Sequence, residues 1–271
     1  MSDMPIEGFQ ELTRKISVER GFGCAGYKEK CLRRRIAVRM RARGVHTYTD
    51  YAQLLDSDGA EYERLLDALT INVTKLFRNW EAYSALASTA VPELWSSGNP
   101  SIRVWSAGCS SGEEPYSIAV LFHRHAATNG MLPQIGRVSV IGTDIDKQSL
   151  TNAERGEFEE GDFADTPDEL RSRYFSPTAP FGVVPSIKRM VRFERRDLLS
   201  DRPPQGKFDL IVCRNVLIYF DRQTQERLFE TFHASLAPGG FLMLGKVETL
   251  LGSVRRQLAP VDARERIFRR A

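Results

Sequence analysis

Residues 104–116, which read VWSAGCSSGEEPY, constrain the fold of this chain most strongly. The β-branched and aromatic residues at the start of the segment predict a strand, and the small residues after them predict a tight turn. Gly108 and Gly112 permit backbone angles that a Cβ would obstruct. Pro115 suits the first turn of a helix, where its missing N–H costs nothing. The segment therefore predicts a strand, a glycine turn and a helix in succession.

A turn of this kind can bind a ligand against bare backbone at the N-terminus of the following helix. The pattern lacks the G-x-G-x-x-G spacing of a dinucleotide site. Two acids, Glu113 and Glu114, follow the turn directly. They disfavour a phosphate and favour a positively charged ligand such as S-adenosylmethionine, which carries a sulfonium and an ammonium group. The alternative is an ordinary strand-to-helix turn that binds no ligand.

The order of strand and then helix recurs after residue 100 and predicts an α/β domain. Strands are expected at 102–106, 138–143, 208–213 and 241–244, and helices at about 115–128, before Gly156 and after Asp221. Such alternation predicts a doubly wound, mostly parallel sheet, which binds ligands outside the carboxyl ends of its strands. Asp144 and the pair Arg214-Asn215 fall at such ends.

The domain organisation follows from where this alternation begins. Residues 6 to about 90 predict helices throughout, so we expect a helical domain at 1–90 and an α/β domain at 91–271. The polar breaker SSGNP at 96–100 places the boundary between residues 80 and 100. Within 158–197, three prolines separate short apolar runs, which predicts either a small antiparallel insertion over 172–195 or an irregular loop.

The positive charge is concentrated in one helix. The segment from Lys28 to Arg43 carries eight basic residues and one acid, in a chain whose formal net charge is only +3. Leu32, Ile36 and Met40 recur at i, i+4 and i+8 and give this helix one apolar stripe. A helix of this composition can dock on an acidic protein, bind nucleic acid, or be a solvated surface.

Several classes of protein are disfavoured by the sequence. No apolar run approaches the ~18 residues of a membrane span. The N-terminus lacks the pattern of a secretory signal, and the four cysteines have no metal-ligand spacing. We therefore expect a cytoplasmic protein with reduced thiols, no metal and no direct membrane insertion. The sequence does not predict the oligomeric state.

Some polar residues at the expected strand ends have two possible roles. Asp144 can accept both hydroxyls of a ribose or can cap a helix, although Asp146 is better placed to cap. Glu113 can hold an ammonium group or can meet the helix dipole. The pair Arg214-Asn215 can line a cleft, and Tyr219 can belong to the core or to a cleft wall.

Four segments together resemble the CheR-type chemotaxis receptor methyltransferases. They are NVTKLFR at 72–78, the glycine turn with its extension to residue 117, the acids of TDID at 143–146, and RNVLIYFD at 214–221. These segments occur in the family's order and span most of the chain. The resemblance implies a class I S-adenosylmethionine-dependent methyltransferase of α/β class, with an N-terminal all-helical domain and a small inserted antiparallel β-subdomain. It implies methyl transfer to glutamate side chains of methyl-accepting chemotaxis receptors, which gives methyl esters and S-adenosylhomocysteine.

The resemblance also implies roles for individual residues. The positions that match cofactor-binding residues are Asn72, Thr74, Arg78, Glu113, Asp144, Asp197, Leu198, Arg214 and Asn215. Among these, Asn72, Thr74 and Arg78 match a helical-domain motif that closes over the cofactor. Arg78 and Tyr219 match residues that address the substrate carboxylate and are therefore the expected catalytic pair.

The chain departs from the family pattern at three places. Asp197 stands where the adenine-side pair usually begins with Asn. Residues 245–248 read GKVE where many members have Gly-His-Ser-Glu or Gly-His-Ala-Glu, so no role is expected for Lys246. The insertion lacks the Gly-x-Gly extension of members that grip a receptor's C-terminal pentapeptide, which predicts a pentapeptide-independent enzyme.

The resemblance favours one partner for the basic helix 28–43. We expect it to dock on the acidic cytoplasmic helices of a receptor rather than on nucleic acid. Two other functions stay open. One is a methyltransferase that acts on nucleic acid or on a small molecule, and the basic helix disfavours the small-molecule substrate. The other is a cofactor-binding module that has lost catalysis, which the presence of Arg78 and Tyr219 disfavours.

Overall fold

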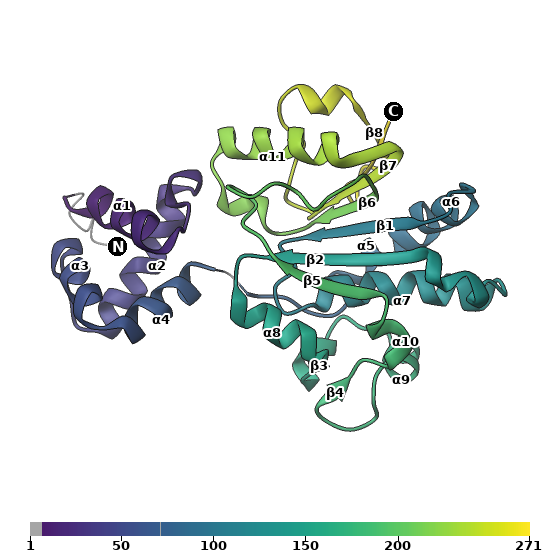
Figure 1. Cartoon of the computed structure of the whole chain (residues 1–271), viewed down its shortest axis with the longest axis horizontal. Helices are drawn as coiled ribbons and strands as arrows, with labels where there is room; N and C mark the ends of the chain where they lie inside the picture. The colour runs from purple at the N-terminus through teal and green to yellow at the C-terminus, as the bar shows by residue number, and fades with distance from the viewer. Residues whose placement is uncertain (1–6, 71) are drawn as a thin grey trace. The chain divides into compact units, whose positions relative to one another are not determined.

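The computed structural model describes residues 7–70 and 72–271, and the chain divides into two compact units (Figure 1). The helical unit comprises the described residues 7–70 together with Tyr219–Thr224. The sheet unit comprises Asn72–Ile218 and Gln225–Ala271.

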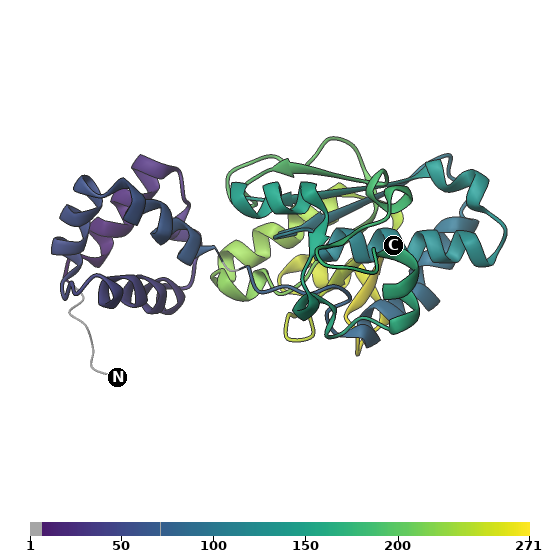
Figure 2. The ribbon, with the colours of Figure 1, turned by 90° about the horizontal axis from the view of Figure 1, so that it is seen from below.

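The helical unit is built from helices that enclose a common interior (Figure 2). They are α1 (Phe9–Arg20), η1 (Cys24–Gly26), α2 (Glu29–Ala42), α3 (Tyr48–Ser57) and α4 (Gly59–Leu69). The predicted apolar stripe of α2, Leu32, Ile36 and Met40, is buried. Gly44 has a φ of +66° just after α2, and the Thr47 hydroxyl accepts the Asp50 N–H at the start of α3. Gly44 and Thr47 therefore mark the end of α2 and the start of α3.

A short segment from far along the sequence completes the helical unit. The carbonyl of Tyr219 accepts the Lys28 N–H at 2.9 Å, and the Asp221 N–H donates to the carbonyl of Gly26 at 3.0 Å. The rings of Tyr27 and Phe220 meet edge to face at 4.9 Å. No local pattern in the sequence indicates that residues 219–224 pack with the N-terminal helices.

The sheet unit contains a seven-stranded sheet in the order β5-β2-β1-β6-β7-β9-β8 among the described residues. Its strands are β1 (Ile102–Ala107), β2 (Val138–Asp144), β5 (Val191–Arg195), β6 (Phe208–Cys213), β7 (Leu236–Leu244), β8 (Leu258–Asp262) and β9 (Ile267–Arg270). The strands from β5 to β7 run parallel, and β9 pairs antiparallel with both β7 and β8. This order confirms the doubly wound, mostly parallel sheet.

Helices cover both faces of this sheet (Figure 1). The helices that contain residues of this unit are α5 (Trp80–Ser88), α6 (Ala90–Ser96), α7 (Glu113–Thr128), η2 (Leu132–Arg137), α8 (Lys147–Arg155), η3 (Glu160–Phe163), α9 (Asp168–Tyr174), α10 (Pro185–Lys188), η4 (Leu217–Tyr219), α11 (Arg222–Ser235) and η5 (Ser253–Arg256). Val104 of β1 shares a core with Ile118 of α7 and Leu86 of α5. Trp105, its neighbour, packs edge to face against Phe232 of α11 at 5.4 Å. Successive residues of a strand point to opposite faces, so a buried strand needs apolar residues throughout.

The first boundary between the units lies earlier than the sequence predicts. The polar breaker predicts it between residues 80 and 100, whereas the sheet unit begins at Asn72. The reason is that α5 and α6 belong to the core under the sheet, where Leu86 and Val91 pack with residues of α7. Helical periodicity shows that these residues form helices but does not show on which body they pack.

The structure confirms a small antiparallel insertion. The predicted bounds 172–195 are wrong at their end, because residues 191–195 belong to the main sheet. A small antiparallel sheet pairs β3 (Glu157–Phe158) with β4 (Phe181–Gly182). However, Val191–Arg195 forms β5 at the edge of the main sheet, parallel to β2. The alternation of Val191 and Phe193 with charged residues suits an edge strand with one covered face, and Phe193 packs on Tyr116 of α7 at 5.7 Å.

Within residues 7–70 and 72–271, no helix has the length and apolar content needed to cross a bilayer. The four cysteines are free thiols. The same ranges contain no group of three or more His, Cys, Asp or Glu side chains arranged to hold a metal ion.

Candidate functional site

The candidate site lies at the topological switch point of the main sheet, where the order in which the strands are added reverses. From β1 the chain extends the sheet through β2 to β5 and then returns to place β6 on the other side of β1. In doubly wound sheets, ligands bind at such a switch point, outside the carboxyl ends of the strands. The turn 108–112, Asp144 and the pair Arg214-Asn215 all follow the carboxyl ends of these central strands.

Both the backbone angles and the close packing of the turn 108–112 require glycine at positions 108 and 112. Gly108 and Gly112 have φ angles of +79° and +97°, which L side chains rarely adopt. A Cβ on Gly108 would lie 2.6 Å from Cγ2 of Val216, and one on Gly112 would lie 2.9 Å from the Cβ of Ala153. The protein's own side chains therefore occupy the space that the glycines leave, so the turn is packed tightly on these sides.

Asp144 ties the end of β2 to the glycine turn. Its carboxylate accepts the Ser110 N–H at 2.8 Å and the Asp146 N–H at 2.9 Å. Burial raises the pKa of Asp144. A carboxylate has about four acceptor positions, so these bonds leave capacity for further hydroxyl donors. Asp146 caps α8 by accepting the N–H groups of Gln148 and Ser149, as predicted.

The segment that begins at Asn72 lies on the glycine turn. The side-chain carbonyl of Asn72 accepts the Ser110 hydroxyl at 3.2 Å, and its amide donates to Asp146. Thr74 is half-buried in the same segment. The resemblance assigned this motif to the helical domain, whereas the structure groups it with the sheet unit.

Two buried acids begin α7. Glu113 accepts the Ser111 hydroxyl at 2.8 Å, and Glu114 accepts the Ser106 hydroxyl at 2.8 Å. Burial raises the pKa of each carboxyl to about 7. For Glu114, the charge of Arg214 opposes this rise. A cation placed beside Glu113 would stabilise its ionised form.

The guanidinium of Arg214 contacts other residues of the sheet unit. It is buried, donates to the carbonyl of Arg78 at 2.9 Å, and lies 5.1 Å from the ring centre of Tyr83. Asn215, the next residue, has a φ of +62°. The guanidinium of Arg78 is half-buried and donates to the carbonyl of Val73 at 2.7 Å.

Asp197 and Leu198 follow β5. The Asp197 carboxylate accepts the Leu199 N–H at 2.8 Å and the Ser200 hydroxyl at 3.0 Å. It therefore caps its own loop, a role for which Asp and Asn serve equally. Leu198 lines a small pocket with Trp105.

The second expected catalytic residue belongs to the other unit. Tyr219 lies in the helical unit, where the Arg35 guanidinium is 5.4 Å from its ring centre. Its pairing with Arg78, which lies in the sheet unit, stays a prediction.

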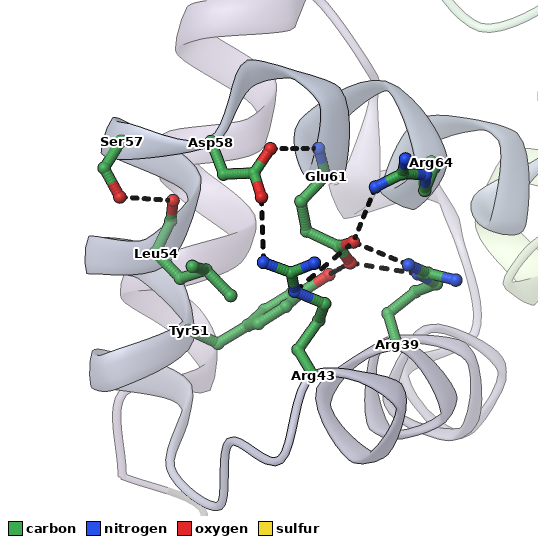
Figure 3. Close-up of polar contacts among 8 residues, drawn as sticks. All are labelled: Arg39, Arg43, Tyr51, Leu54, Ser57, Asp58, Glu61 and Arg64. Carbon is green, nitrogen blue, oxygen red and sulfur yellow. Dashed lines mark hydrogen bonds and ion pairs between the residues drawn. The ribbon is translucent and has the colours of Figure 1, made fainter.

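Several arginines of α2 stabilise the helical unit (Figure 3). Arg39 donates to both carboxylate oxygens of Glu61, at 3.0 and 2.6 Å, and Arg43 donates to Asp58 at 2.9 Å. Glu61 is 0% exposed and also accepts the Tyr51 hydroxyl at 2.7 Å. Two further arginines act in the same way: Arg33 binds Glu29, and Arg35 binds the carbonyls of Ala68 and Leu69.

The remaining cations of α2 point to solvent. Lys30, Arg34 and Arg41 are exposed, and they form no hydrogen bond or ion pair within the described ranges. Val38, between them, is 50% exposed. The spacing i, i+4, i+8 and i+11 puts these four residues on one side of the helix, which we call the exposed basic face.

Sequence reasoning gave no role to a buried acid of the sheet unit, Glu248. The side chain of Glu248 accepts N–H groups from Gly245, Asn215 and Leu217. Its position after a strand, three residues beyond a glycine, was a signal that could have identified it.

Comparisons with known proteins agree on the relatives of this chain. A family model described as "CheR methyltransferase, SAM binding domain" matches residues 72–267, and one described as "CheR methyltransferase, all-alpha domain" matches residues 7–70. The chain is 33% identical to a chemotaxis protein methyltransferase of Listeria monocytogenes, over 92% of this chain and 93% of that protein. It is 35% identical to one of Pseudomonas putida, over 79% of each. It is also 33% identical to part of an uncharacterized 104.1 kDa protein of Rhodobacter capsulatus, over 97% of this chain and 28% of that protein.

Proposed function

This chain belongs to the CheR methyltransferase family, and from that premise we propose that it methylates glutamate side chains of methyl-accepting chemotaxis receptors. Its fold and family make it an S-adenosylmethionine-dependent methyltransferase. The observation that carries the proposal is the match of both family domains, along 7–70 and 72–267, together with similarity to chemotaxis methyltransferases over most of their length. The products would be glutamate methyl esters and S-adenosylhomocysteine, formed in the cytoplasm.

The residues at the switch point fit the cofactor. S-adenosylmethionine supplies, when bound, a methyl group on a positively charged sulfur. A buried carboxylate whose pKa is raised by burial, Glu113, suits its ammonium group. Asp144 suits the ribose hydroxyls because it ends β2 and retains acceptor capacity. We assign Asn72, Thr74 and the pair Arg214-Asn215 to the walls of the same site, and Asp197-Leu198 to its adenine side.

The substrate carboxylate needs no general base. An exposed glutamate has a pKa of ~4.3 and is already ionised at neutral pH. Catalysis then depends on alignment of the reacting groups, which can contribute ~7–11 kcal/mol. In this proposal Arg78 holds one carboxylate oxygen and Tyr219 donates a hydrogen bond to it. A guanidinium has five N–H groups, so the bond from Arg78 to Val73 still permits this role.

The exposed basic face of helix 28–43 is the proposed receptor-docking surface. Lys30, Arg34 and Arg41 are free to meet acidic side chains, whereas Arg39 and Arg43 are committed to Glu61 and Asp58. An arginine-rich face would steer an acidic receptor helix and align on it. Nucleic acid is the rival partner and would be bound through phosphates.

The direct test uses radiolabelled S-adenosylmethionine and receptor cytoplasmic fragments. The proposal predicts carboxyl methyl esters on the fragments, which release their label in base. Label that is stable to base, or that appears in added RNA or small molecules, would contradict it. Removing the last five residues of the receptor should change the rate little, because the enzyme is expected to be pentapeptide-independent.

Docking is tested by charge reversal. Arg34→Glu and Arg41→Glu should lower the methylation rate, and raised salt should lower it further because the Debye length falls from ~10 Å at 0.1 M to ~3 Å at 1 M. Arg14→Glu is the matched control, since Arg14 is exposed on α1 and makes the same charge change elsewhere on the helical unit. Equal rates for all three variants would overturn the docking surface.

A further inference from the structure

Glu248 is a buried carboxylate to which neither the sequence nor the proposed mechanism gives a role. Its side chain is 4% exposed and lies in the turn after β7. It accepts the N–H groups of Gly245 at 2.7 Å, Leu217 at 2.8 Å and Asn215 at 3.1 Å. Two of these donors belong to the loop after β6, so one carboxylate joins the loops that follow two neighbouring strands.

The loop 214–217, which Glu248 binds, packs against the glycine turn. Val216 lies between the two amides that Glu248 binds, and its Cγ2 lies 2.6 Å from the position of a Cβ on Gly108. Asn215 has a φ of +62°, a conformation that costs free energy for a residue with a side chain. The bond from its N–H to Glu248 stabilises that conformation. Displacing the loop would therefore move both Asn215 and the wall of the turn.

The chemistry of the three donors explains why an acid stands here. An ionised carboxylate only accepts hydrogen bonds, through about four positions, and three backbone N–H groups converge on this one. An amide in its place would turn an N–H₂ group toward N–H donors. The turn after β7 also packs closely against the loop after β6, because a Cβ on Gly245 would lie 2.9 Å from the Asn215 nitrogen.

We propose that Glu248 is a positioning residue for the S-adenosylmethionine site, which it shapes by fixing the loop 214–217 against the glycine turn. It touches neither cofactor nor substrate in this role. The inference rests on the proposed function only in that Arg214 and Asn215 are taken to line the site.

The test measures the affinity of the full chain for S-adenosylhomocysteine by calorimetry. Glu248→Gln should bind it about tenfold more weakly than the wild type, which corresponds to ~1.4 kcal/mol. In the same variant, the amides of Asn215 and Leu217 should exchange hydrogen faster. Glu265→Gln is the control, because Glu265 is another buried carboxylate of the sheet unit, paired with Lys246 at 3.8 Å. It should leave both readouts unchanged even where it lowers the melting temperature.

A second variant keeps the inference testable if Glu248→Gln does not fold. Val216→Ala leaves Glu248 in place and removes the contact with Gly108, so it should also weaken binding of S-adenosylhomocysteine. Wild-type affinity in whichever of these two variants folds would overturn the inference. Asn215→Ala separates the two proposals: if it alone weakens binding, the role of Glu248 fails, and if it binds normally, the assignment of Asn215 to the cofactor site fails.

Discussion

Replacing Glu61 with glutamine should strongly destabilise the helical unit. Glu61 is fully buried and accepts hydrogen bonds from Arg39 and Tyr51 (Figure 3). Hydrogen bonds to charged groups contribute ~1.5–3 kcal/mol each, and removing one partner of a fully buried ion pair costs ~3–5 kcal/mol. The side chain of Arg39 retains 21% of its exposure and that of Arg43 retains 35%, so water compensates part of this loss. We therefore expect a loss of ~2–3 kcal/mol in the free energy of unfolding.

That loss is a large share of the stability of such a unit. Domains gain ~0.05–0.15 kcal/mol per residue on folding, which gives only ~4–11 kcal/mol for a body of this size. The variant should therefore unfold at a clearly lower urea concentration.

The assay can follow the two units separately. All three tryptophans, Trp80, Trp95 and Trp105, lie in the sheet unit, so their fluorescence reports on that unit. Far-ultraviolet circular dichroism reports on helices of both. We expect Glu61→Gln to shift the dichroism transition while the tryptophan transition changes little. Glu63→Gln on the same helix is the control, because that side chain is 62% exposed and its ion pair with Arg20 should contribute under ~1 kcal/mol. A loss below ~1 kcal/mol for Glu61→Gln would refute the reasoning.

The same network gives a dependence on pH. Burial alone would raise the pKa of Glu61, but hydrogen bonds from Arg39 and Tyr51 outweigh it and lower the pKa below its ordinary value. A carboxyl with a lowered pKa in the folded state stabilises the fold above the unfolded pKa of ~4.3 and loses that contribution as the pH falls through the folded pKa. The stability difference between the wild type and Glu61→Gln should therefore shrink at acidic pH.

Three further predictions concern cofactor and catalysis. Asp144→Ala should weaken binding of S-adenosylmethionine by more than tenfold, since it removes two charge-assisted hydrogen bonds of ~1.5–3 kcal/mol each, and unchanged affinity by calorimetry would exclude the ribose role. Affinity for S-adenosylmethionine should also fall as the pH is lowered through about 7, because the pKa of Glu113 is raised to about 7 and only its ionised form attracts an ammonium group. This dependence should vanish in Glu113→Gln, and its persistence there would assign it to another group. Arg78→Ala and Tyr219→Phe should lower the methylation rate more than they lower cofactor affinity, and wild-type rates in both would show that neither addresses the substrate.

The sequence predicted the parallel sheet well because its buried strands stand out as short apolar runs. Buried parallel strands require continuous apolar runs, and β6 supplies one from Leu210 to Cys213. The helix ends at Thr47, Asp146 and Gly156 were equally predictable, because capping uses the residue's own backbone neighbours. These features depend on short stretches of sequence, which a single chain displays.

Features that depend on distant residues were not predictable. Nothing in the local pattern of α5 shows that Leu86 packs under the sheet rather than with the N-terminal helices. The same limit applies to the basic helix, where Arg39 and Arg41 look alike in sequence. Only the position of Glu61, on another helix, makes the first a structural residue and leaves the second exposed. Glu248 escaped attention because its partners at 215 and 217 lie about thirty residues earlier.

The family models treat the two domains as consecutive segments, yet the helical unit takes back Tyr219–Thr224 from the middle of the other. A chimera that exchanges only the first seventy residues between family members would therefore pair foreign helices with the host's six-residue segment. The main-chain bonds of Lys28 to Tyr219 and of Asp221 to Gly26 tolerate any donor residue except proline, but the ring contact between Tyr27 and Phe220 depends on the side chains. The helical unit is thus discontinuous in sequence, and exchanging it between family members requires both pieces to move together.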